Sequence, residues 1–87
     1  MAALSYELMT TFYTKSRAAL AEDLFEESFA WSNCEAAVNN IHHGKYPTEW
    51  LPQLKSLLES HRSDQTDPKL VAVFTEAIEY VDIAMLG

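Results

Sequence analysis

The one cysteine of the chain, Cys34, is its obvious candidate nucleophile. A cysteine becomes a catalytic nucleophile when a nearby histidine takes its proton, and the candidate here is His42, eight residues further on. On one helix that spacing separates the two side chains by roughly 12 Å of rise, which is too far for a thiolate–imidazole pair. Cys34 also shares a helical stripe with Val38 and Ile41. We therefore expect it to be a small buried hydrophobic residue.

Two adjacent histidines, His42 and His43, raise the question of a metal site. Neighbouring residues on a helix diverge by about 100°, so both rings cannot reach one ion unless the helix unwinds. A helical metal site favours histidines four residues apart, and positions 38 and 39 hold valine and asparagine. Both histidines suit the last turn of a helix, where they can cover free carbonyl groups. We expect no metal ion and no cofactor.

Closely spaced carboxylates are the third possible source of chemistry. Glu22 with Glu26, and Asp23 with Glu26 or Glu27, lie close together on one helix face. Catalytic carboxylate pairs need burial and unequal environments to separate their pKa values, and a row of solvated acids has neither. Phosphate-binding glycine motifs are also absent from the sequence. The sequence therefore predicts a protein that is not an enzyme.

The same acids are better explained as a binding surface. No lysine or arginine occurs between Arg17 and Lys45, and five acids lie in that stretch: Glu22, Asp23, Glu26, Glu27 and Glu35. Like charges four residues apart destabilise an isolated helix by a few tenths of a kcal/mol each, and a basic protein partner would relieve that repulsion. The alternative is a solvated face that only aids solubility.

Four aromatic residues are candidate anchors for such a partner, because large aromatic side chains concentrate binding energy. Phe25 and Phe29 lie beside the acids on the helix surface. The alternative to a role in binding is that two neighbouring helices bury both phenylalanines. Tyr46 and Trp50 lie on either side of Pro47, near the start of the helix expected at 48–61. For Trp50 the alternative is a place in the core of the protein. The predicted protein-binding residues are Glu22, Asp23, Glu26, Glu27, Phe25, Phe29, Tyr46 and Trp50.

Helices must position these residues, since the chain has only 2 glycines and 3 prolines. Gly44 and Pro47 stop one helix, and Asp67 with Pro68 starts another, with the aspartate as N-cap and the proline at the first helical position. The expected fold is all-α, a compact bundle of three to four helices in a single domain, 1–87. Apolar spacing places the helices at about 4–15, 16–30, 32–43, 48–61 and 67–86, with the first ones possibly merged.

A break or kink is expected near residues 30–33. On a helical wheel with about 100° per residue, one apolar arc contains Leu20, Leu24, Phe25, Phe29 and Trp31. Before Trp31 the opposite side of the wheel holds the acids Glu22, Asp23, Glu26 and Glu27. After Trp31 that same side is apolar and contains Cys34, Ala37, Val38 and Ile41. A straight helix cannot bury both arcs on one surface. Ser32-x-x-Glu35 is a capping-box sequence at this position.

Composition limits the classes of partner. Thirteen acidic and six basic side chains give a formal charge of −7, which argues against direct binding to nucleic acid or to an anionic membrane. No run of about 18 apolar residues and no signal-peptide pattern is present in the sequence, so we expect a soluble cytoplasmic protein. Hydrophobic residues make up 48% of the chain, which is enough to build a core.

In size, acidity and expected helical fold, the chain resembles the small immunity proteins that neutralise bacterial nuclease toxins, and small phage-encoded inhibitors. The resemblance covers composition and carries over no site residue. With the acidic face, it favours a non-enzymatic protein that binds another protein as an inhibitor, immunity protein or regulatory adaptor. Two alternatives remain open. One is a structural homo-oligomer, such as a homodimer, and the other is a DNA mimic whose carboxylates occupy a nucleic-acid-binding protein.

Overall fold

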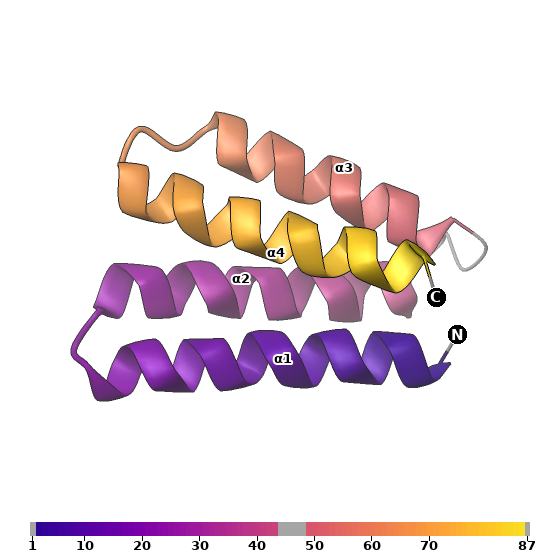
Figure 1. Ribbon diagram of the computed structural model, residues 1–87, viewed down its shortest axis with the longest axis horizontal. Coiled ribbons are helices and arrows are strands. Elements are labelled where there is room, and N and C mark those ends of the chain that lie inside the picture. Colours follow the sequence, from indigo (N-terminus) through magenta and orange to yellow (C-terminus); the bar gives the residue numbers. More distant parts are fainter. Residues whose placement is uncertain (1, 44–48, 87) are drawn as a thin grey trace.

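The described part of the chain, residues 2–43 and 49–86, forms four helices in the computed structural model (Figure 1). These helices are α1 (Ala2–Ala21), α2 (Phe25–His42), α3 (Trp50–Ser63) and α4 (Pro68–Leu86). The predicted all-α bundle of three to four helices is confirmed. The segments expected at 4–15 and 16–30, either separate or merged, are continuous as far as Ala21, where α1 ends.

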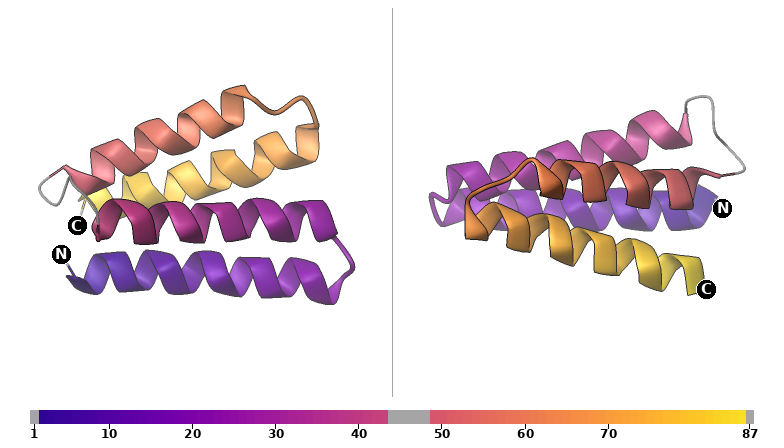
Figure 2. Two further views of the ribbon diagram at one scale, coloured as in Figure 1. Left: turned by 180° about the vertical axis from the view of Figure 1, so that it is seen from behind. Right: turned by 90° about the horizontal axis from the view of Figure 1, so that it is seen from above.

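The helices form two antiparallel hairpins, α1–α2 and α3–α4, that pack against each other (Figures 1 and 2). α2 and α4 each contact the other three helices, whereas α1 and α3 do not contact each other. The turn at 22–24 and the loop at 64–67 lie at the same end of the bundle, and the two chain ends lie at the other. In the described ranges, no helix is both long and apolar enough to cross a membrane.

The break between the first two helices lies at residues 22–24, so the prediction of a break near 30–33 is wrong. Asp23 adopts a left-handed conformation with φ 61°. The Leu24 N–H donates to the Ala19 carbonyl at 2.9 Å and the Asp23 N–H to the Leu20 carbonyl at 3.0 Å. This pair of bonds is a Schellman motif, which usually has glycine at the left-handed position. Aspartate is among the few other residues that tolerate that conformation, so α1 ends without a glycine.

The wheel argument failed because it assumed that both apolar arcs of α2 are buried. The second arc is in the core, with Cys34, Ala37 and Val38 buried. In the first arc, Phe25 is 63% exposed and Phe29 is 69% exposed. Trp31, at the end of the first arc, is buried. Because Phe25 and Phe29 stay in solvent, α2 needs no break and is continuous through residue 32. Ser32 does not cap a helix, and its hydroxyl instead lies 3.1 Å from that of Ser16 in α1.

Small side chains let α1 and α2 approach closely. Ser16 and Ser28 are both buried, and their hydroxyl groups bond reciprocally across the two helices. Ser16 Oγ donates to the Ser28 carbonyl at 3.0 Å, and Ser28 Oγ donates to the Ser16 carbonyl at 2.9 Å. A larger side chain at either position would push the backbones apart. The two serines therefore fix how the α1–α2 hairpin is assembled.

All four helices contribute to one core. Its largest fully buried side chains are Phe12, Cys34, Val38, Trp50, Leu54, Leu58, Phe74 and Val81. The apolar stripes predicted for 48–61 and 67–86 are therefore in the core. The predicted start of the last helix is also confirmed, because Asp67 Oδ1 accepts a hydrogen bond from the Lys69 N–H at 2.9 Å. The helix stop expected at Gly44 and Pro47 lies outside the described residues.

Candidate protein-binding site

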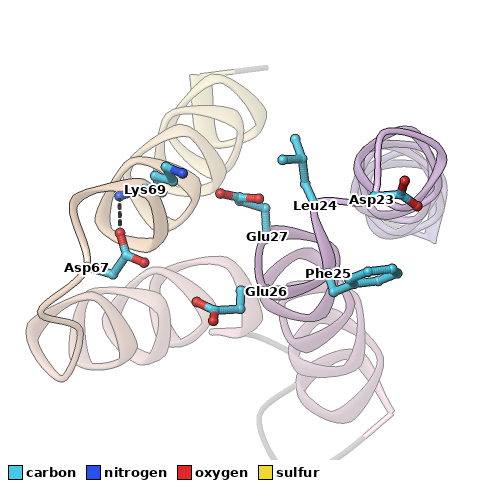
Figure 3. Close-up of a pocket in the computed structure, with 7 residues that line it drawn as sticks. All are labelled: Asp23, Leu24, Phe25, Glu26, Glu27, Asp67 and Lys69. Atoms are coloured by element: carbon cyan, nitrogen blue, oxygen red, sulfur yellow. Dashed lines mark hydrogen bonds between the residues drawn. The ribbon is translucent and has the colours of Figure 1, made fainter.

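Acidic side chains from both hairpins meet at the end of the bundle that carries the 22–24 turn. They surround an open hollow of about 380 Å³ (Figure 3). Four acids line it, and Glu22 adjoins Asp23 in the 22–24 turn; we call these five the acidic end: Glu22, Asp23, Glu26, Glu27 and Asp67. Lys69 is the one basic residue that lines the hollow in the described part of the chain. The site therefore has an excess of negative charge.

The acids point to different sides of α2 (Figure 3). Glu26 extends toward α3, and Glu27 extends toward the start of α4, where Lys69 lies. Phe25 projects from the opposite side of α2, away from both glutamates. Leu24 stands between Asp23 and Glu27. A partner that covers this end of the bundle would therefore meet carboxylates and apolar side chains together.

None of the acids of this end forms an ion pair with another described residue. In the described ranges, the ion pairs are Lys15–Glu76 and Lys55–Asp82, each at 2.7 Å. Both join α4 to a neighbouring helix, away from the 22–24 turn. The hydrogen bond to Glu76 raises the pKa of Lys15, and that to Asp82 raises the pKa of Lys55. The acidic end therefore keeps its charge for solvent or for a partner.

Exposed apolar side chains border the acidic end. Leu24, Phe25 and Phe29 are all exposed, so the alternative that neighbouring helices bury the two phenylalanines does not hold in this structure. Phe29 and Glu26 also line a second hollow, of about 180 Å³, between α2 and the α3–α4 hairpin. Its floor includes Leu70 and Phe74, which is a core residue. Phe29 thus lines a hollow whose walls are both polar and apolar.

Two of the predicted anchors do not belong to this surface. Trp50 is 1% exposed and lies in the core, where its ring meets that of His42 edge-on at 5.7 Å between centroids. It also begins α3 at the end of the bundle opposite to the acidic end. Tyr46 lies outside the described residues. The exposed candidates are therefore Glu22, Asp23, Glu26, Phe25 and Phe29, with Glu27 partly buried.

The residues that could do covalent or metal chemistry lie elsewhere. Cys34 is fully buried, and this burial raises the pKa of its thiol to about 12. A protonated, inaccessible thiol is not a nucleophile. His42 and His43 meet edge-on, with 4.7 Å between ring centroids. Within the described residues, no group of three or more His, Cys, Asp or Glu side chains is arranged to hold a metal ion.

The sequence analysis missed one member of the acidic end. Asp67 follows Glu27 by forty residues and was recognised only as a helix cap. The signal that could have found it is topology, because antiparallel hairpins of similar length place both of their turns at one end.

The fold and the surface define the chain as a small four-helix protein with an acidic, partly apolar end. It matches no family model, and no curated protein or solved structure matches it significantly.

Proposed function

We propose that this protein is a binding protein without catalytic activity, and that its acidic end docks on a basic surface of another protein. It would act as an inhibitor, immunity protein or regulatory adaptor does, by occupying that surface. The observation that carries the proposal is the combination of unpaired acids with exposed Phe25 and Phe29 at the same end.

The electrostatic part of the proposal concerns the rate of association. Opposite charges on two surfaces steer their diffusional encounter and raise the association rate constant at low salt. Four of the five acids come from residues 22–27, and Asp67 adds a fifth from the other hairpin. A basic partner would also relieve the repulsion among these clustered carboxylates.

The apolar part concerns the lifetime of the complex. Exposed phenylalanines gain free energy when a partner buries them, and such residues are typical anchors at the centre of an interface. Phe29 lies beside the hollow above Leu70 and Phe74, so a partner side chain can contact both Phe29 and the edge of the core. Charge would bring the partner to this end, and the phenylalanines would hold it there.

A pair of matched charge variants tests this proposal. Glu22→Lys/Glu26→Lys reverses two acids of the acidic end, and Glu49→Lys/Glu79→Lys makes the same change in net charge at exposed positions elsewhere. Proteins retained from cell lysate by the wild type and by the control, but lost with the first variant, are candidate partners. With a purified candidate, we expect the association rate constant to fall about tenfold for the first variant and little for the control.

The phenylalanines provide the second arm of the test. Phe25→Ala and Phe29→Ala should each speed dissociation about tenfold or more, whereas Ile83→Ala, at a position 65% exposed on α4, should not. An association rate that is independent of salt, together with binding unchanged by the Glu22→Lys/Glu26→Lys variant, would overturn the proposal. Competition by duplex DNA for the same partner would identify its basic surface as a nucleic-acid site and the mode of binding as DNA mimicry.

A further inference from the structure

The outer face of α1 carries a regular row of exposed side chains that the fold does not use. Tyr6 is 66% exposed, Tyr13 is 50% exposed and Leu20 is 39% exposed, and they follow one another at intervals of seven residues. Thr10 and Arg17 lie between them and are also exposed. The row has the spacing of a heptad stripe, and three of its five side chains, Tyr6, Tyr13 and Leu20, are large and aromatic or apolar.

This row is separate from the face that α1 buries in its own bundle. The buried positions are Ser5, Leu8, Phe12, Ser16 and Ala19. α1 lies at an edge of the bundle, where it contacts α2 and α4 but not α3. α1 thus has one face toward the core and a second patterned face toward solvent.

The charges of the outer face are balanced, unlike those of the rest of the molecule. Glu7 and Arg17 are exposed, and neither has an ion-pair partner among the described residues. They stand ten residues apart, which is about 15 Å along the helix, so they cannot pair within one chain. Lys15, the remaining charged residue of α1, is bound to Glu76. The outer face of α1 therefore adds no net charge to the repulsion between two copies of a protein of charge −7.

We propose that the outer face of α1 binds a second copy of this chain, with the two α1 helices antiparallel about a two-fold axis. This alignment places Tyr6 opposite Arg17 of the second copy, and Thr10 opposite Tyr13 of the second copy. The guanidinium then reaches both a tyrosine ring and the Glu7 carboxylate, which are partners that stabilise arginine at interfaces. Two-fold symmetry repeats every contact once.

A hollow on the same face fits this arrangement. It has a volume of about 380 Å³ and is lined by Tyr6, Glu7, Thr10 and Thr11. The antiparallel alignment brings Tyr13 and Arg17 of the second copy over it. A parallel alignment would instead set Arg17 against Arg17 and bring the acidic ends together. In the antiparallel dimer, the 22–24 turns point in opposite directions along bundles that are each 36 Å long, so the acidic ends stay apart.

The test is an exchange of charges followed by sedimentation. The wild type should show a concentration-dependent monomer–dimer equilibrium at loading concentrations on the order of 10 to 300 µM. Arg17→Glu should weaken dimerisation at least about tenfold, because it replaces two attractive pairs by two repulsive ones. The double variant Glu7→Arg/Arg17→Glu should recover most of the loss. Lys69→Glu, which changes the net charge equally at an exposed position on α4, should have little effect.

Orientation is tested in mixed dimers with one spin-labelled copy. The labelled chain carries Ala18→Cys and Cys34→Ala, and the other copy carries ¹⁵N and no label. We expect the amide signals of Tyr6 and Glu7 in the ¹⁵N copy to broaden, whereas a parallel pair would broaden those next to residue 18. Sedimentation as a monomer over the whole concentration range, or equal affinities for wild type and Arg17→Glu, would overturn the proposal. Neither measurement involves a basic partner, so its outcome is independent of the proposed function.

Discussion

Cys34 shows how the surroundings of a single residue decide its chemistry. The side chain has no exposed surface and lies in the same cluster as Trp31, Val38 and Phe74. Burial disfavours the thiolate and raises the pKa of Cys34 to about 12, compared with an ordinary value of 9.0. A residue type that can serve as a nucleophile is therefore a packing residue at this position.

This burial predicts how stability depends on alkaline pH. The Cys34 thiol ionises near its ordinary pKa in the unfolded chain but only near 12 in the folded protein. Its contribution to stability is therefore complete below about pH 8.5 and is lost progressively up to pH 12, by at most about 1.4 kcal/mol per pH unit. Urea unfolding from pH 7 to pH 10 measures the slope. Cys34→Ala should flatten it, although the smaller side chain lowers stability by roughly 1 kcal/mol at pH 7.

Thiol labelling provides an independent check. A disulfide reagent at pH 8 should modify native Cys34 only at the rate at which the protein opens, and should modify it at once in urea. Rapid labelling of the native state, or an unchanged pH slope in Cys34→Ala, would contradict this description of the residue.

The length of an element can depend on one backbone position. α1 ends because Asp23 adopts φ 61° and the Schellman bonds close around it. A non-glycine residue in this conformation has a cost of about 1 kcal/mol or more, which the rest of the hairpin offsets. One compensating interaction is the reciprocal hydrogen bonding of Ser16 and Ser28, which joins the helices on either side of the turn.

Substitution of Asp23 tests the role of this turn. Asp23→Gly should raise the free energy of unfolding by about 0.5–1 kcal/mol, because glycine adopts a positive φ without steric cost. Asp23→Asn is the control, since it removes the charge and keeps the tolerance for this conformation, and it should stay near the wild type. Asp23→Val should destabilise, because a β-branched residue is strained there. Chemical denaturation measures all three, and equal stability of the glycine and valine variants would rule out the turn as the determinant.

At the scale of the whole molecule, the charge is concentrated rather than spread evenly. Two hairpins place Glu26, Glu27 and Asp67 around one hollow, whereas the two ion pairs seen among the described residues join α4 to its neighbours. Both pairs are partly solvated, so water screens them and their contribution to stability is small. We therefore expect repulsion at the acidic end to outweigh these two pairs, and a basic partner would remove that repulsion.

Salt should consequently stabilise this acidic protein. Raising NaCl from about 0.01 M to 0.5 M shortens the Debye length several-fold and screens repulsion at the acidic end. We expect the free energy of unfolding to rise by roughly 1 kcal/mol. The gain should shrink in Glu22→Lys/Glu26→Lys, and it should shrink less in the matched Glu49→Lys/Glu79→Lys. Thermal unfolding at both salt concentrations checks this, and a loss of stability with added salt would show that the ion pairs dominate instead.

Local sequence signals predicted α3 and α4 well, whereas the helix expected at 16–30 is divided by the 22–24 turn. The recurrence of Phe74, Ala77 and Val81 along one face requires a helix that buries that face, and Asp67 with Pro68 sets its start through a hydrogen bond between neighbouring residues. Such signals act within one or two turns of chain, so the sequence carries them directly. The acidic character of residues 22–27 was equally evident before the fold was known.

The position of the first break and the make-up of the binding site depended on tertiary structure. Phe29 would be buried only if another helix packed against its side of α2, and it is exposed instead. The apolar arc therefore changes sides along α2 without a break in the helix. Trp50 was a candidate anchor, and the packing of α3 against the other helices puts it in the core. Local patterns in the sequence were enough to place α3 and α4 and to show where negative charge accumulates. Packing alone decided which apolar faces stay exposed and brought Asp67 to the acidic end, because both depend on contacts between residues far apart in the chain.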